Sequence, residues 1–276
     1  MSRWRIDLGY DGADFYGWAV QPGLRTVQGE LETWITRLLQ LDQPAELVVA
    51  GRTDAGVHAR HQVAHLDLPD DRSDDVDDLA RRLLRVLPDD LIVHRIAAAP
   101  TGFDARFSAS WRHYCYRLWD DTSSADPIRR GNVLSVRGSL DLTAMAAGAQ
   151  TLLGLRNFAP FCKWREGATM IRDLKATRVR RRADGCGTIE VELRADAFCR
   201  SMVRSVVGAL VEVGSGRRDA TWLAAVAATS VRASEVTVLP AKGLTLEKVG
   251  YPPRRQLAAR AAQARSIRTL PTQEQQ

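Results

Sequence analysis

Residues 46–68 have the sequence ELVVAGRTDAGVHARHQVAHLDL, in which two apolar runs flank a loop bounded by Gly51 and Gly56. The first run, Glu46–Ala50, predicts a short strand that leads directly into the loop. The second run, His61–Leu68, alternates in the manner of a strand with two different faces. This stretch therefore predicts two successive strands joined by a glycine-framed loop.

Four further elements are expected around this stretch in the first hundred residues. Alternation predicts strands at Arg3–Tyr10 and Leu91–Ile96. Apolar residues at helical spacing predict an amphipathic helix over residues 27–40 and another over residues 76–87. The acidic run Asp70–Asp78 supplies the first turn of the second helix, where negative charge complements the helix dipole. The order strand-helix-strand-strand-helix-strand is that of a ferredoxin-like half.

The second half of the chain repeats much of this order. Its expected elements are strands at Tyr114–Trp119, Ile171–Arg182, Thr188–Asp196 and Gly243–Val249 and helices at Leu142–Leu153, Met202–Val213 and Asp219–Thr229. The alternation of the Ile171–Arg182 arm is poor, so its register stays open. We expect an α+β protein of two similar ferredoxin-like halves, with abutting, mainly antiparallel sheets and a central cleft.

The expected domains are residues 1–110, residues 111–251 and a basic tail at 252–276 that is mobile or weakly helical. The chain of 276 residues carries a net charge of +6. The tail holds five arginines and a single acid, Glu274. Because the tail accounts for most of the net charge, bulk charge is poor evidence that the folded part binds phosphate. No apolar run approaches the roughly 20 residues of a membrane span, and no signal-peptide pattern is present, so a cytoplasmic location is expected.

The cysteines and histidines do not form a recognisable metal or disulfide pattern. The four cysteines are scattered without a Cys-x-x-Cys pair, which favours reduced thiols. His58, His61 and His65 lie close together in the sequence. No carboxylate or thiol completes a ligand set with them, so a strand and its preceding loop explain them better than a metal site.

Asp54 is the sharpest candidate for chemistry. It lies in the loop after an apolar strand, a place where functional groups are commonly presented. Arg52, two residues earlier, is the expected partner that keeps the carboxylate ionised. On spacing alone, however, a tight Asp-x-Gly turn in which Asp54 bonds only to its own backbone is the more common use of such a run.

A set of motifs across the chain decides between these interpretations. Gly51–Ala59 resembles the signature loop of the tRNA pseudouridine synthase A family. Further segments resemble motifs of that family in the same order, over about residues 3–251: Tyr10–Gly12 with Phe15, Gly17 and Trp18; Thr26–Gln28; Phe103–Ala109; Tyr114; Phe198; Met202–Arg204; Val207–Gly208; Pro240; Gly243–Leu244; Val249. Four positions depart from the pattern: Ala19, His61, Asp104 and Asn157.

The resemblance implies the pseudouridine synthase fold and the isomerisation of uridine to pseudouridine at positions 38, 39 and 40 of the tRNA anticodon stem-loop. It assigns the essential carboxylate or nucleophile to Asp54, base stacking to Tyr114, and substrate binding also to Arg52 and Arg204. It further implies a homodimer that binds tRNA. Since nothing is oxidised and no group is imported, no cofactor is expected, and neither a nucleotide cofactor nor a membrane partner is implied.

Two other functions remain to be compared with this one. A catalytically silent RNA-binding protein would need base-stacking aromatic residues on a sheet face, and no such strand is recognisable. A small-molecule hydrolase would need a second acid paired with Asp54, and no motif supplies it. Two basic clusters, Arg178–Arg182 and Arg217–Arg218, fit either phosphate contacts or solvated surface.

Overall fold

The structure, a computed structural model, describes residues 1–69, 76, 78–164, 169–266 and 269. They form two compact units, the first from residues 1–110 and 246–266 and the second from residues 111–245. Most of the acidic run Asp70–Asp78 and most of the tail after residue 266 lie outside the described residues. The predicted α+β class with mainly antiparallel strands is confirmed in both units.

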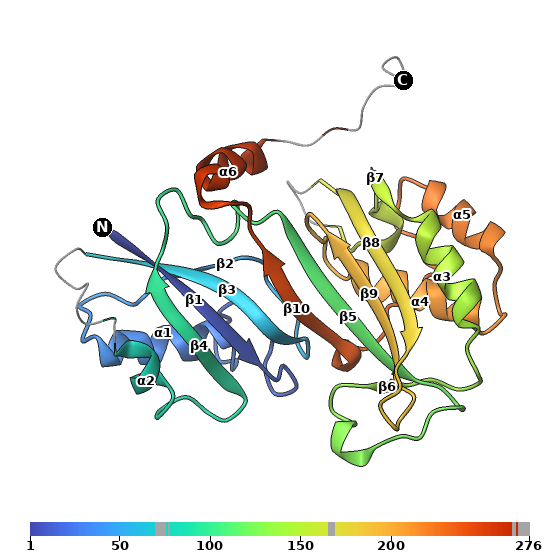
Figure 1. Cartoon of the computed structure of the whole chain (residues 1–276), viewed down its shortest axis with the longest axis horizontal. Helices are drawn as coiled ribbons and strands as arrows, with labels where there is room; N and C mark the ends of the chain where they lie inside the picture. The colour runs from blue at the N-terminus through green and yellow to red at the C-terminus, as the bar shows by residue number, and fades with distance from the viewer. Residues whose placement is uncertain (70–75, 77, 165–168, 267–268, 270–276) are drawn as a thin grey trace. The chain divides into compact units, whose positions relative to one another are not determined.

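The first unit has the strand order β4-β1-β3, with β2 and β10 also bonded to β3. Its elements are β1 (Ser2–Tyr10), α1 (Val27–Leu38), β2 (Leu47–Val49), β3 (His58–Leu68), α2 (Leu79–Leu83), β4 (Leu91–Ala98), β10 (Leu244–Gly250) and α6 (Leu257–Arg265) (Figure 1). Strand β1 is antiparallel to both of its neighbours, β3 and β4. This order is that of a ferredoxin-like sheet, as the alternation of strands and helices predicts.

Helix α1 shows how the sequence builds this unit. Thr26 caps its first turn by accepting a hydrogen bond from the Gly29 backbone at 3.2 Å. Val27, Leu31 and Ile35 then follow at helical spacing and are fully buried. The helix packs against α2. The apolar stripe of α1 therefore forms part of the core of the unit.

The C-terminal part of the first unit differs from the sequence prediction. Residues 246–251 were expected in the second half, and the tail after them as mobile or weakly helical. In the structure β10 is bonded to β3, and the Tyr251 hydroxyl donates to the Ala105 carbonyl at 2.7 Å. Helix α6 follows at Leu257–Arg265, anchored by the buried Leu257 and Ala261. The helical alternative of the prediction is thus the one found over Leu257–Arg265, and its buried residues fix the helix to the first unit.

The second unit repeats part of the same topology. Its elements are β5 (Trp111–Trp119), β6 (Leu134–Ser135), α3 (Leu142–Thr151), β7 (Gly154–Asn157), β8 (Ile171–Arg181), β9 (Ile189–Ala195), α4 (Met202–Gly214) and α5 (Ala220–Ala228) (Figure 1). Its strand order is β5-β9-β8-β7, with β6 paired to β5 in parallel. The run β5-β9-β8 corresponds to β1-β3-β2 of the first unit. The two-residue β6 and the four-residue β7 were not predicted, because such short strands carry no readable alternation.

Charge pairs on β8 and β9 explain the register that the sequence left open. Glu190 is 2% exposed, and its carboxylate pairs with Arg117 at 3.3 Å, Arg180 at 2.7 Å and Arg182 at 3.3 Å. Arg180 lies directly opposite Glu190 in the antiparallel ladder. Arg178 lies opposite Glu192 in the same ladder, so opposite charges across the two strands stabilise the polar face of this pair.

In the part of the chain that the structure describes, no helix is long and apolar enough to cross a membrane. The same residues contain no cluster of three or more histidine, cysteine, aspartate or glutamate side chains arranged to hold a metal ion. His65 accepts a hydrogen bond from the Ala105 backbone, and His61 lies beside the His94 ring. These two histidines thus have separate contacts within the fold.

Asp120 is a buried carboxylate at the end of β5 whose side chain is fully enclosed. Burial favours its neutral form. Hydrogen bonds from Arg181 at 2.9 Å, the Leu140 backbone at 3.0 Å and nearby hydroxyls outweigh this effect and hold the pKa of Asp120 far below its usual range. Its carboxylate therefore joins β5, β8 and the segment before α3.

We expect Asp120→Asn to lower the free energy of unfolding by about 2–3 kcal/mol at pH 7, because charge-assisted hydrogen bonds are lost. A depressed carboxyl pKa stabilises the protein above the unfolded pKa of about 4 and loses that effect as the pH falls further. Urea denaturation at several pH values should thus show the difference shrinking below about pH 4. A difference that stays constant into this acidic range would contradict the assignment, and the exposed Asp89→Asn serves as the control.

Candidate active site

The loop that carries Asp54 joins β2 to β3 in the first unit, and its backbone lies against the loop between β1 and α1. Trp18 donates its backbone N–H to the Thr53 carbonyl at 3.1 Å, and Gly56 donates to Phe15 at 3.2 Å. A Cβ on Gly17 would lie 2.8 Å from the Thr53 carbonyl oxygen, closer than real Cβ atoms approach. Gly17 also has a φ of +92°, which favours glycine. The backbones of the two loops are therefore packed directly against each other.

Buried hydrogen bonds to residues of β1 and β3 support this loop on its core side. The Tyr10 hydroxyl lies 2.8 Å from Thr53 Oγ1. The Gln62 amide donates to the Tyr10 hydroxyl at 3.3 Å and to the Gly51 carbonyl at 2.9 Å. Burial raises the pKa of Tyr10 to about 12, so the phenol stays neutral and keeps its proton. The sequence motifs did not predict that Tyr10, Thr53 and Gln62 support the loop, because Tyr10 lies far from the other two along the chain.

Asp54 itself is half-buried, whereas Arg52 is exposed to solvent. Thr53 lies between them and is buried against Tyr10. That Arg52 keeps the Asp54 carboxylate ionised stays a prediction, and Arg52 lies at the surface beside the loop.

Tyr114 lies on β5 of the second unit and is 8% exposed. Its ring is met edge-on by Phe198, with 5.0 Å between the ring centroids. Tyr116, two residues further along β5, donates its hydroxyl to the Pro240 carbonyl at 2.6 Å. Burial raises the pKa of Tyr116, although the nearby Arg204 guanidinium opposes this shift. Tyr116 therefore has a structural role, while Tyr114 has an aromatic neighbour that fixes its ring.

Arg204 lies in the first turns of α4 in the same unit. Its Nε donates to the Leu239 carbonyl at 2.7 Å, so the side chain is held against the 237–239 segment. Gly208, one turn later, faces the Thr237 carbonyl with no space for a side chain. The face of α4 that carries Arg204 and Gly208 thus contacts this segment, and the substrate-binding role of Arg204 stays a prediction.

A disulfide joins Cys162 to Cys199 in the second unit, with a Cα–Cα distance of 5.8 Å. The expectation that all four cysteines are thiols is wrong for this pair, and scattered spacing could not reveal it because the two are 37 residues apart. Cys199 follows Phe198 and precedes α4. The disulfide therefore fixes the segment that brings Phe198 to Tyr114.

The comparisons with known proteins identify the family. The chain is 61% identical to tRNA pseudouridine synthase A of Cutibacterium acnes over 98% of this chain and 96% of that protein. The chain belongs to the tRNA pseudouridine synthase A family. It is also 52% identical to tRNA pseudouridine synthase A of Streptomyces griseus, over 98% of this chain and 95% of that protein. A family model described as tRNA pseudouridine synthase matches residues 148–252.

Among solved structures, the chain is similar to the structure of an H/ACA RNP bound to a substrate RNA containing 2′-deoxyuridine. The match has a TM-score of 0.35 and 10% identity, and it covers 75% of this chain and 44% of that one. The likeness is too weak to identify a fold.

Two departures from the motifs of the tRNA pseudouridine synthase A family have local explanations. Asp104 accepts hydrogen bonds from the Arg106 and Phe107 backbones, both at 2.8 Å. Asn157 accepts one from the Ala159 backbone at 3.0 Å. Both side chains satisfy backbone donors of a turn, which a short polar side chain does well. The departures thus preserve local structure in this member of the family.

The hydrogen bonds among Tyr10, Thr53 and Gln62 can be tested by mutation. We expect Tyr10→Phe to lower kcat by about 10-fold, because Thr53 loses its partner and the carboxylate is held less firmly. KM for tRNA should change little, since the buried hydroxyl cannot reach RNA. Steady-state kinetics with tRNA measures both constants. The hydroxyl-retaining Thr53→Ser should keep most of the wild-type rate. An unchanged kcat in Tyr10→Phe would rule out the positioning role.

Proposed function

We propose that this chain isomerises uridine to pseudouridine in tRNA and that Asp54 is its catalytic carboxylate. The observation that carries the proposal is the full-length identity of 61% to a tRNA pseudouridine synthase A, combined with a loop whose backbone is built to hold one carboxylate. The buried Tyr10 and Thr53 support the loop, and Asp54, the next residue, is half-buried. A loop held so firmly suits a group that must meet a substrate in one geometry.

The reaction breaks the bond between N1 of uracil and C1′ of ribose, turns the base, and joins C5 to C1′. The C5 proton leaves and a proton is gained at N1, so atoms and electrons balance within the nucleotide. An ionised Asp54 serves either as a nucleophile at C1′ or as the base that removes a sugar proton. Both routes place negative charge beside a cation-like sugar, as carboxylates do in glycosidases.

We propose substrate-binding roles for Tyr114 and Arg204 of the second unit and for Arg52 of the first. The target uridine must leave its stack to reach Asp54, and a flipped base is commonly held by aromatic stacking worth about 1–3 kcal/mol. Tyr114 suits this role because Phe198 fixes its ring from the edge. Arg204 and the exposed Arg52 provide positive charge for the substrate phosphates.

The finer assignments follow from the family resemblance. The proposed targets are uridines 38, 39 and 40 in the anticodon stem-loop, and the proposed active form is a cytoplasmic homodimer that binds tRNA. The chemistry as written consumes no redox equivalent and transfers no outside group, so the proposal includes no cofactor. Flipping is least costly in a loop or at the end of a stem, which suits these positions.

Replacement of Asp54 tests the catalytic role. We expect Asp54→Asn to lower the single-turnover rate by at least about 10³-fold while tRNA affinity stays within a factor of about three. Pseudouridine is mapped in unmodified tRNA after incubation with each protein. Asp14→Asn is the matched control, since Asp14 is an exposed carboxylate in the neighbouring loop.

Equal modification by wild type and Asp54→Asn would refute the catalytic assignment. If wild-type protein binds tRNA but forms no pseudouridine, the catalytically silent RNA-binding function is favoured instead. If wild type neither binds nor modifies tRNA, the proposed function itself fails.

Tyr114→Phe separates stacking from proton transfer. If Tyr114 only stacks, Phe preserves the ring and we expect kcat to fall by less than about three-fold. If its hydroxyl assists removal of the C5 proton, we expect kcat to fall by about 10²-fold or more with little change in KM. A Tyr114→Ala protein should lose both functions, and a wild-type rate in Tyr114→Ala would exclude Tyr114 from the site.

A further inference from the structure

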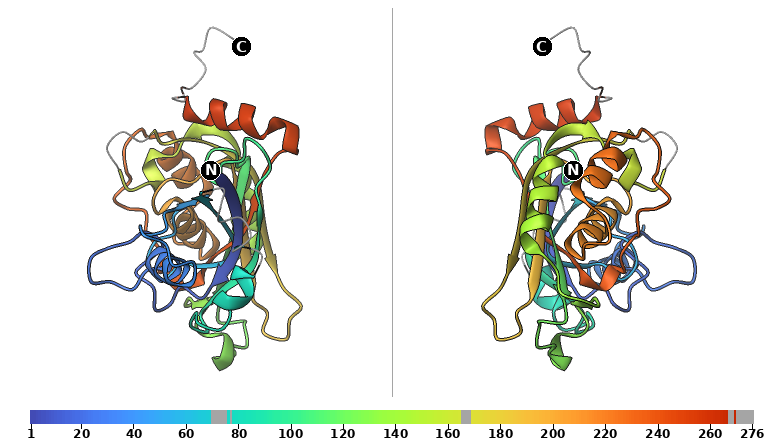
Figure 2. Two further views of the ribbon diagram at one scale, coloured as in Figure 1. Left: turned by 90° about the vertical axis from the view of Figure 1, so that its left-hand side faces the viewer. Right: turned by 90° about the vertical axis from the view of Figure 1, so that its right-hand side faces the viewer.

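Residues 251–266 form a basic segment that is fixed to the first unit. It contains four arginines and no acidic residue. Leu257 and Ala261 of α6 are buried, and the Leu257 carbonyl accepts a hydrogen bond from the Ser108 hydroxyl at 3.1 Å. Gly102 lies against Ala258 with no space for a Cβ between them. The backbone of the segment therefore has a defined position, and its helix α6 can be followed in Figures 1 and 2.

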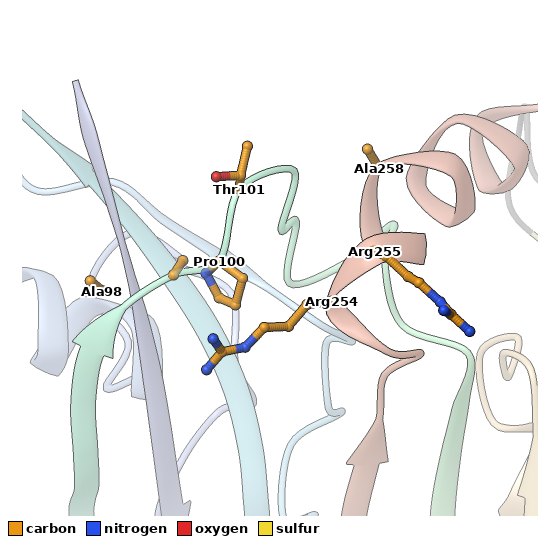
Figure 3. Close-up of a pocket in the computed structure, with 7 residues that line it drawn as sticks. Ala98, Pro100, Thr101, Arg254, Arg255 and Ala258 are labelled. Atoms are coloured by element: carbon orange, nitrogen blue, oxygen red, sulfur yellow. The ribbon is translucent and has the colours of Figure 1, made fainter.

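A hollow of about 590 Å³ lies between the start of this segment and the end of β4. Its lining residues are Ala98, Ala99, Pro100, Thr101, Arg254, Arg255 and Ala258. None of them carries a carboxylate. Figure 3 shows the Arg254 side chain extending below Pro100, whereas Arg255 extends in the opposite direction. The two guanidinium groups thus diverge from adjacent backbone positions.

These two arginines differ from other basic residues of the chain. Arg180 and Arg182 bond to Glu190, Arg181 to Asp120 and Arg217 to Glu212, so most arginines of the two basic clusters have acidic partners within the fold. Arg265 has a long contact of 3.4 Å to Asp104. Within the described residues, Arg254 and Arg255 are exposed and have neither an ion pair nor a side-chain hydrogen bond. Their charge is available for an external anion.

The position of the hollow separates it from the Asp54 loop. Ala98, on its rim, pairs with Trp4 near the start of β1. The Asp54 loop contacts Tyr10 at the other end of the same strand. Tyr10 follows Trp4 by six positions along β1, so the two residues are about 20 Å apart in an extended strand. The hollow therefore lies too far away to hold the nucleotide on which Asp54 acts.

We propose that Arg254 and Arg255 form a second RNA-binding surface, which contacts backbone phosphates of the bound tRNA away from the target uridine. This inference rests on the proposed function for the identity of the polyanion. Diverging guanidinium groups fit two phosphates of a polynucleotide better than one free phosphate ion, which would need convergent donors. The contacts are sequence-independent and contribute affinity without taking part in the chemical step.

Removal of the two charges tests the surface. We expect Arg254→Ala/Arg255→Ala to raise the Kd for tRNA on the order of 10-fold at 0.1 M salt. The slope of log affinity against log salt should become shallower by about 1.4–1.8, because each of the two phosphate contacts contributes about 0.7–0.9. The rate constant at saturating tRNA should not change. Both side chains are exposed, so the thermal midpoint should equal that of wild type, which verifies folding.

The matched control is Arg81→Ala/Arg217→Ala, which removes the same net charge from two exposed arginines that are paired with Asp78 and Glu212. We expect its Kd and salt slope to stay close to wild type. If this control loses as much affinity as Arg254→Ala/Arg255→Ala, bulk charge explains the effect and the proposal fails.

Two further outcomes would overturn the proposal. One is an unchanged Kd and salt slope in Arg254→Ala/Arg255→Ala. The other is competition by inorganic phosphate at constant ionic strength that lowers the tRNA affinity of wild type to that of the variant, since this would identify a small-anion site. Both measurements report binding, so they remain distinct from the loss of pseudouridine formation that tests Asp54.

Discussion

The loop after β1 and the loop that carries Asp54 approach each other so closely that glycine is required where they meet. A side chain at Gly17 would collide with the Thr53 carbonyl and the backbone of residues 54–55, and one at Gly12 would collide with Val57. Backbone hydrogen bonds from Trp18 to Thr53 and from Gly56 to Phe15 then join the two loops. The direction of Asp54 is therefore set by backbone contacts, with the Tyr10 hydroxyl supporting Thr53 from the core.

The same close packing gives the sequence neighbours of Asp54 different positions in the structure. Thr53 is committed to the buried network and Arg52 remains at the surface, although all three are consecutive. In the second unit, Phe198 plays a comparable supporting role for Tyr114, and the disulfide from Cys199 fixes the segment that carries Phe198. Each proposed functional side chain thus depends on residues that make no chemical contribution themselves.

The electrostatics of the chain depend on where acids are placed more than on net charge. Glu190 is buried among Arg117, Arg180 and Arg182, and a carboxylate there is tolerated only because these guanidinium groups surround it. Because Glu190 offsets part of their positive charge, these arginines attract RNA only weakly. The segment from Tyr251 to Ser266 contains no acidic residue, and within the described residues its exposed Arg254 and Arg255 have no acidic partner. A count of basic residues alone could not distinguish these two situations.

The sequence by itself determined the order of strands and helices, the ferredoxin-like topology of the first unit and the position of Asp54 in a glycine-framed loop, because periodicity and turn residues are local properties. Only the tertiary structure decided that Thr53 is buried between its neighbours Arg52 and Asp54, that Cys162 bonds to Cys199, and that β10 and α6 belong with the first unit. The Tyr10–Thr53–Gln62 network likewise joins positions more than 40 residues apart. Such contacts depend on which strands become neighbours, and that choice reflects the free energy of the whole packed unit rather than any local pattern.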